Sequence, residues 1–176
     1  MASGKTTLGR ALTHAVPALR FIDLDEAVEE AAGTSVANIF ATRGEEEFRA
    51  LESAVLRSVA SPDTVVACGG GTPCTAANMD FMLASGTVVR LEASVSTIVR
   101  RLLEAPAGQR PLVAACHGDK AALTAKVEAM LSERAQAYAR APYSFNADRL
   151  DTEEQIAESV AEFSGRFLPA YFDKGV

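Results

Sequence analysis

Apolar and polar positions follow two different periods along the chain, and their alternation predicts strands separated by helices. Short, largely apolar runs predict buried strands, and they lie at residues 19–22, 64–68, 87–91 and 143–147. Apolar residues at three- and four-residue spacing predict helices, which cover residues 6–14, 26–32, 35–42, 44–59, 94–103, 120–138 and 152–163. This order indicates an α/β fold, a parallel sheet with helices on both faces, and therefore three layers.

Two segments carry no regular period. Residues 104–119 contain Pro, Gly and His, and we interpret them as a lid loop. Residues 164–176 are expected to form a loosely packed tail. We find no linker or internal repeat, so we expect one domain over residues 1–176.

Composition excludes several classes of protein. With 48% apolar residues the chain is not intrinsically disordered. The net charge of −6 argues against nucleic acid or an anionic membrane as the main partner. No apolar run is long enough to span a membrane, and the N-terminus lacks the pattern of a signal peptide. An odd number of cysteines, three, indicates a reducing compartment. We expect a cytoplasmic protein.

A phosphate-binding sequence stands at the N-terminus. Gly4-Lys5-Thr6-Thr7 matches the end of the pattern G-x-x-x-x-G-K-[ST], in which backbone N–H groups and the lysine hold phosphates and the hydroxyl holds Mg²⁺. The first glycine of the pattern would fall two residues before Met1. A Gly-Lys-Thr turn also occurs at ordinary helix starts, so this motif alone leaves both interpretations open.

Acidic residues and glycines follow two of the predicted strands. Asp23 and Asp25 lie at the carboxyl end of a strand, where α/β sheets bind ligands, although one of them could simply cap a helix. Gly69-Gly70-Gly71 follows the next strand. One or two glycines would suffice for a flexible turn, whereas three favour a backbone that lies against a ligand.

Three arginines are candidate anion-binding residues. Arg134 follows Met130 and Leu131 on the apolar side of its helix, so it needs an anionic partner or must extend to solvent. Arg49 has glutamates one turn away on both sides and could form a plain surface ion pair. Arg110 lies in the lid loop, where an exposed arginine is equally compatible with the sequence.

In this order, the segments GKTTLG, FIDLDEAVEE, IFATRGEEEFRALE, CGGGTP, QRPL and ERAQAY resemble shikimate kinases, small P-loop enzymes of aromatic amino-acid biosynthesis. The resemblance extends from Gly4 to about Phe163. It implies a five-stranded parallel sheet, with the P-loop after the central strand and a mobile lid over ATP. The family has that strand and the first P-loop glycine ahead of the segment that begins at Met1. We therefore expect that the loop around the phosphates lacks some of its N–H donors. We also expect that the two strands that would flank the central strand lack that partner.

The resemblance also implies roles for individual residues. It assigns ATP binding to the following residues: Ser3, Gly4, Lys5, Thr6, Thr7, Arg110 and Arg149. It assigns Mg²⁺ to Thr6 and Asp23, and catalysis to Lys5, Asp25 and Arg110. The implied shikimate-binding residues are Asp25, Arg49, Gly69, Gly70, Gly71 and Arg134, with the two arginines on the carboxylate. Glu52 would orient Arg49, and Phe40 and Phe48 would form a wall of the pocket.

The implied activity is Mg²⁺-dependent transfer of phosphate from ATP to the 3-hydroxyl of shikimate by a monomer. Two alternatives stay open. A gluconate or nucleotide kinase would share the P-loop but would not need three glycines together with two arginines. A non-catalytic P-loop remnant would bind an anion or a partner without turnover, and the incomplete P-loop is its support.

Overall fold

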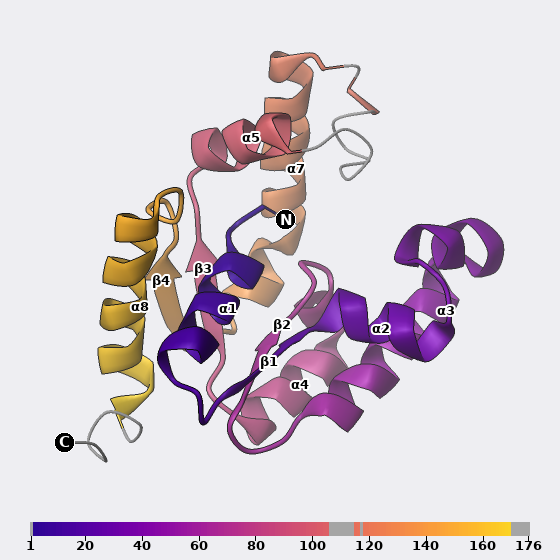
Figure 1. Ribbon diagram of the computed structural model, residues 1–176. Helices are drawn as coiled ribbons and strands as arrows, with labels where there is room; N and C mark the ends of the chain where they lie inside the picture. The colour runs from indigo at the N-terminus through magenta and orange to yellow at the C-terminus, as the bar shows by residue number, and fades with distance from the viewer. Residues whose placement is uncertain (1, 106–114, 117, 170–176) are drawn as a thin grey trace.

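The computed structural model describes residues 2–105, 115–116 and 118–169. The N-terminal half contains α1 (Lys5–Ala15), β1 (Arg20–Asp23), α2 (Leu24–Ala32), α3 (Val36–Val59), β2 (Thr64–Ala67) and α4 (Ala76–Ser85). The C-terminal half contains β3 (Val89–Glu92), α5 (Val95–Glu104), α7 (Lys120–Tyr138), β4 (Tyr143–Asn146) and α8 (Glu153–Phe167). Figure 1 shows this α/β arrangement, and it confirms the predicted alternation of parallel strands and helices.

Within the described ranges the strands form two separate parallel pairs. β1 pairs with β2, and this register sets Asp23 opposite Ala67. β3 pairs with β4, with Glu92 opposite Asn146. Both carboxyl ends of a parallel pair lie at the same edge, so Asp23 and the glycines that follow Ala67 are brought close together.

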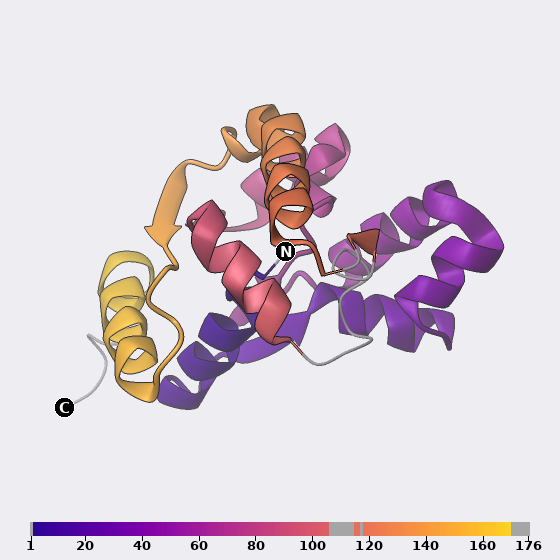
Figure 2. The ribbon, with the colours of Figure 1, turned by 90° about the horizontal axis from the view of Figure 1, so that it is seen from above.

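The hydrophobic core is divided in the same way. One cluster joins α1 and α8 to β4 through residues such as Leu8, Phe145 and Val160. A second joins α2 to α3, and a third joins α5 to α7. Figure 2 shows α8 and β4 on one side, α2 and α3 on the other, and α5 and α7 between them near the N-terminus. Among the described residues, the buried apolar side chains therefore form three clusters.

A cavity of about 870 Å³ separates the two strand pairs. It is lined along the full length of β2 and β3, from 61–63 at one end to Gly69 and Gly70 at the other. Most residues of both strands are only half-buried, whereas strands of a parallel sheet are normally buried on both faces. The cavity lies where the resemblance implies the central strand, and Ser3 and Lys5 line it as well.

Two regions differ from the elements that the hydrophobic pattern predicts. The pattern predicted no element over 72–86, yet a short turn of 3-10 helix (Thr72–Cys74) and α4 lie there. Apolar and small residues occur on several faces of α4, so no single apolar stripe marks it. The two helices predicted over 35–42 and 44–59 are the two arms of α3, which bends at Gly44 (φ 83°, ψ 175°).

The predicted tail begins too early. α8 continues to Phe167, because the ring of Phe167 packs on Phe163 and Tyr143 with centroid distances of 4.7 Å and 5.6 Å. The centre of the predicted lid, residues 106–114 and 117 including Arg110, lies outside the described residues. None of the described helices is long and apolar enough to cross a membrane.

Candidate active site

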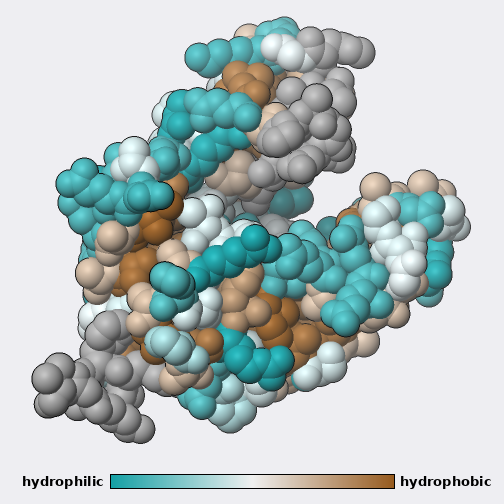
Figure 3. Space-filling model, in the orientation of Figure 1, coloured by the Kyte–Doolittle hydropathy of each residue, from teal (hydrophilic) through white to brown (hydrophobic). Residues whose placement is uncertain are grey.

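A pocket of about 620 Å³ opens where the carboxyl ends of β1 and β2 meet the N-terminus of α1. It is lined by most of the residues singled out in the sequence: Ser3, Gly4, Lys5, Thr6, Thr7, Asp23, Asp25, Phe40, Phe48, Arg49, Glu52, Gly69, Gly70, Gly71 and Arg134. The molecule is hollowed between the α5–α7 end and the α2–α3 arm (Figure 3), and hydrophilic residues border this hollow. Segments 130 residues apart in sequence therefore contribute to one site.

The N-terminus of α1 forms the phosphate-binding end of the pocket. Gly4 caps the helix in a left-handed conformation (φ 89°, ψ 15°). The left-handed conformation favours glycine, and a Cβ atom there would also lie 2.6 Å from Leu150 Cδ1, which would have to move. Lys5 Nζ lies 3.4 Å from Ser3 Oγ. The free N–H groups of the first helical turn, together with a lysine, make a site for an anion.

Thr6 and Asp23 are joined at this end of the pocket. Thr6 Oγ1 donates a 2.7 Å hydrogen bond to Asp23 Oδ2. The other oxygen, Asp23 Oδ1, accepts from the backbone N–H of Asp25 at 3.1 Å and thereby caps α2. Asp23 therefore does cap a helix, and its second oxygen also lies at the α1 end of the pocket. A hydroxyl and a carboxylate are the hard oxygen donors that suit Mg²⁺.

Asp25 lies deeper along the same wall, beside Gly69. A Cβ atom on Gly69 would be 3.2 Å from Asp25 Oδ1, so glycine gives the carboxylate room. Partial removal from water raises the pKa of Asp25 above its usual value, and the charges of Asp23 and Glu52 raise it further, while Lys5 acts in the opposite direction. A carboxyl group with a raised pKa is better suited to accept a proton than an ordinary aspartate.

Arg49 is held by a buried carboxylate. Glu52 is 1% exposed, and it accepts hydrogen bonds from Arg49 Nη1 at 2.9 Å and from Thr72 Oγ1 at 2.6 Å. Glu45 also pairs with Arg49, at 3.2 Å, so the surface ion pair considered for this residue is present too. Burial works against the charge of Arg49, but the hydrogen bond and charge of Glu52 outweigh it, and the pKa of Arg49 is raised.

Arg134 approaches the pocket from α7. Its side chain is half-buried, and within the described ranges it has neither an ion pair nor a hydrogen bond. A half-buried guanidinium without a partner provides forked donors for an incoming carboxylate. Arg134 on α7 and Arg49 on α3 line the same pocket.

Arg149 does not line the pocket. It forms an exposed ion pair with Glu158 at 2.6 Å. The turn after β4 directs the neighbouring residues Leu150 and Asp151 toward the pocket instead. The interpretation of Arg149 as an ATP-binding residue therefore has no support from its position.

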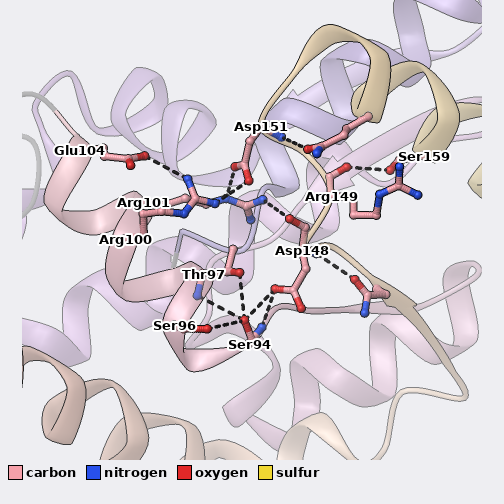
Figure 4. Close-up of polar contacts among 12 residues, drawn as sticks. Ser94, Ser96, Thr97, Arg100, Arg101, Glu104, Asp148, Arg149, Asp151 and Ser159 are labelled. Carbon is pink, nitrogen blue, oxygen red and sulfur yellow. Dashed lines mark hydrogen bonds and ion pairs between the residues drawn. The ribbon is translucent and has the colours of Figure 1, made fainter.

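Arg101 is a pocket residue that the motifs did not reveal. It is 13% exposed, and its Nε donates to Asp151 Oδ1 at 2.8 Å while Nη2 donates to the carbonyl of Asp148 (Figure 4). Its Nη1 is buried without a hydrogen-bond partner among the described residues, and it lies 3.6 Å from the position of a Cβ atom on Gly4. A free N–H donor thus lies beside the phosphate-binding turn. The basic pair at 100–101 looks like any helix surface in sequence, so only the tertiary position of Arg101 identifies it.

A glycine-capped lysine turn, a Thr–Asp oxygen pair and a pocket that brings Asp25 together with Arg49 and Arg134 define a P-loop kinase of small molecules. Comparisons with known proteins make the class specific, because the model of the shikimate kinase family matches residues 1–164. A shikimate kinase from Parabacteroides distasonis is 40% identical over 157 residues, which are 89% of this chain and 88% of the relative. The chain belongs to the shikimate kinase family.

Two solved structures agree with this assignment. The shikimate kinase of Bacteroides thetaiotaomicron superposes with a TM-score of 0.88 at 38% identity, covering 94% of this chain and 93% of that chain. The shikimate kinase of Acinetobacter baumannii, in complex with shikimate, superposes with a TM-score of 0.78 at 27% identity, covering 94% and 88%. The predicted family and fold class are therefore confirmed.

Proposed function

We propose that this protein phosphorylates the 3-hydroxyl of shikimate with ATP, giving shikimate 3-phosphate and ADP in aromatic amino-acid biosynthesis. One observation carries the assignment of residues. Asp25, Arg49, Arg134 and the three glycines line the same pocket as the phosphate-binding turn of α1. Such a pocket selects a molecule that bears both a hydroxyl and a carboxylate, and it sets that hydroxyl near the phosphates.

The phosphate end neutralises the charge of ATP. Lys5 and the N–H groups at the start of α1 face the phosphates, and the free Nη1 of Arg101 adds a further donor. Thr6 and Asp23 would hold Mg²⁺, which would offset negative charge on the phosphates when bound. Arg110 would reach the phosphates from the predicted lid, as the resemblance implies. Phosphoryl transfer requires mainly such alignment and charge neutralisation.

Asp25 positions the nucleophile. Its carboxylate accepts the hydrogen bond of the 3-hydroxyl and takes the proton. As it does so, a bond forms between the hydroxyl oxygen and the γ-phosphorus, and the bond from that phosphorus to ADP breaks. The raised pKa of Asp25 favours this role, because a stronger base takes the proton more readily.

The two arginines bind the carboxylate of shikimate. Guanidinium groups match a planar carboxylate with paired donors, which lysine does not. Arg49 reaches the pocket with its orientation fixed by Glu52, whereas Arg134 brings an unpaired guanidinium. The glycines keep the intervening wall low enough for a ring to lie against the backbone.

The test measures ADP release from ATP with shikimate as acceptor. We expect release that saturates with shikimate and disappears when Mg²⁺ is removed with EDTA. Gluconate and a nucleoside monophosphate serve as alternative acceptors, since they represent the related kinases. Equal release with gluconate or water would refute the assignment. Shikimate binding by calorimetry without any turnover would instead support a non-catalytic remnant.

We also propose a cytoplasmic monomer. The described residues of one chain supply the carboxylate, the arginines and the phosphate-binding turn of the proposed site, so the proposal invokes no second copy. Cys68, Cys74 and Cys116 are free thiols, as expected in a reducing compartment. Burial raises the pKa of Cys68 to about 12, so this thiol stays protonated and unreactive near the pocket.

A further inference from the structure

Tyr138 contacts the backbone of the glycine segment. Its hydroxyl donates a 2.8 Å hydrogen bond to the carbonyl oxygen of Gly70, which lies 68 positions earlier in the sequence. Tyr138 is the last residue of α7, and Arg134 lies one turn before it. Residues four apart share one face of a helix, and both Tyr138 and Arg134 line the cavity between the two strand pairs.

The glycine segment needs such a contact. Three successive glycines have no side chains that could fix their conformation, and glycine loses more backbone freedom on folding than any other residue. The carbonyl of Gly69 accepts from Thr72 N–H at 3.2 Å, and the carbonyl of Gly71 accepts from Cys74 N–H at 3.0 Å. These two bonds belong to the short turn that follows the glycines. They leave the carbonyl of the central glycine unbound by that turn.

The central carbonyl is held from α7. Cys74 Sγ approaches the Gly70 oxygen at 3.9 Å, but a thiol is a weak donor. The phenol of Tyr138 is therefore the strong donor that this oxygen has among the residues described. The hydrogen bond from Tyr138 to Gly70 thus connects two parts of the site. It joins α7, which carries Arg134, to the glycine segment, which Arg49 contacts at Gly71.

We propose that Tyr138 is a positioning residue, which fixes Gly70 and sets the separation of Arg134 from Arg49. The inference rests on the proposed binding of shikimate between these arginines. With the bond in place, both guanidinium groups face one carboxylate. Without this bond, α7 and the glycine segment shift independently. The distance between the guanidinium groups of Arg134 and Arg49 is then no longer fixed. Binding of shikimate then weakens, while ATP, which binds at the α1 end, is unaffected.

The kinetic test uses Tyr138→Phe, which removes one hydroxyl and keeps the ring. We expect the KM for shikimate to rise about five- to tenfold, the effect of losing one hydrogen bond. The KM for ATP and kcat should stay within about twofold. A merely structural role would lower the active fraction, and thus kcat, without separating the two substrates. An unchanged KM for shikimate would overturn the proposal.

The matched control is Tyr143→Phe. Tyr143 is 49% exposed on β4, and its hydroxyl has no hydrogen bond within the described ranges. It should leave both KM values unchanged. A double-mutant cycle of Tyr138→Phe with Arg134→Lys adds a second criterion. Non-additive losses are expected if Tyr138 acts through Arg134, whereas strictly additive losses would overturn that connection.

Amide hydrogen exchange by NMR tests the same bond without any substrate. In Tyr138→Phe, the amides of residues 69–72 should exchange faster, while those of α8 should not change. Unchanged exchange over 69–72 would overturn the proposal. Hydrogen exchange separates the proposed function from the proposed role of Tyr138. If the wild-type protein failed to bind shikimate, the proposed function would be wrong. The exchange rates would still decide whether Tyr138 fixes the glycines.

Discussion

The guanidinium of Arg49 lies directly against the backbone of Gly71. A Cβ atom added to Gly71 would stand 2.5 Å from Arg49 Nη2 and 2.7 Å from Nη1. Real Cβ atoms essentially never show such contacts, so the guanidinium of Arg49 occupies the space that a side chain would need. The third glycine therefore leaves room for the guanidinium of Arg49 in its present position.

Gly71→Ala should therefore impair shikimate binding. The added methyl group displaces the guanidinium, which is the flexible end of its side chain, so the fold is kept while Arg49 leaves its place beside Glu52. We expect the KM for shikimate to rise about tenfold or more, in line with the loss of a charge-assisted hydrogen bond. The KM for ATP should not change. Steady-state kinetics with each substrate varied in turn measures both.

Gly86→Ala is the matched control. Gly86 follows α4 with an extended backbone (φ −179°), and no atom lies within 4 Å of the position of its Cβ atom. Both KM values should match those of the wild type. A shikimate KM that stays unchanged in Gly71→Ala would show that Arg49 does not bind the substrate from its present position.

Asp25→Asn should lower kcat by about 10²–10⁴, the range for loss of a general base. The raised pKa of Asp25 gives the sign of the pH dependence. Wild-type kcat should fall as the pH drops through a value above 3.8, because protonated Asp25 no longer accepts the proton. This acidic limb should be absent from the residual activity of the variant. A near-normal kcat would remove Asp25 from the reaction.

The same substitution should stabilise the protein. A carboxyl whose pKa is raised in the folded state contributes stability that is present at low pH and lost as the pH rises through that pKa. At pH 7 the ionised Asp25 lies near Asp23 and Glu52, and the neutral amide relieves this repulsion. Urea unfolding at pH 7 should give a higher midpoint for Asp25→Asn than for the wild type. Glu26→Gln, which changes the exposed partner of Arg10, is the control for both measurements.

Some of the pocket residues that the sequence revealed lie in contiguous motifs at strand ends. Asp23 and Asp25 follow one strand and Gly69 follows its neighbour, so parallel pairing alone brings them together. Arg101 and Tyr138 were missed because each contacts a partner far away in sequence: Arg101 contacts the carbonyl of Asp148, and Tyr138 contacts that of Gly70. No local spacing records such contacts.

The position of Arg149 could not be predicted from the sequence for a related reason. Its position depends on the turn after β4, where a shift of one residue decides between the pocket and solvent. The turn places Leu150 against Gly4 and leaves Arg149 on the surface with Glu158. Helix α4 was missed for a different reason, since the buried Asn78 and Met79 and the half-buried Phe81 and Met82 leave no single polar face.

Arg134→Ala should weaken shikimate binding by about 2–5 kcal/mol, the usual cost when a charged pair loses one partner. We place the result near the lower end, roughly thirtyfold, because Arg134 is only half-buried. Calorimetric titration with shikimate measures the change. Lys126→Ala, which removes an exposed charge from the same helix, should have no effect. Equal affinity in the Arg134 and Lys126 variants would exclude Arg134 from the site.

The cavity between β2 and β3 leads to the last prediction. Both strands present an edge without a partner strand in the part of the chain that the structure describes, and the core is divided into three clusters around them. An added strand between them would complete both ladders and bury apolar surface on two sides. A P-loop normally follows such a strand, and Ser3 and Lys5 line the end of the cavity where it would emerge.

We therefore expect a fusion of about seven residues ahead of residue 1, an apolar five-residue strand with a glycine and one further residue, to stabilise the protein. Tm should rise by at least about 4 °C, which corresponds to 1–2 kcal/mol in this size range. The KM for ATP should also fall, because the added loop supplies N–H donors to the phosphates. The control replaces the central residue of the added strand with proline, which cannot donate to the ladder. If both fusions changed Tm equally, or neither did, the cavity would not be a site for a strand.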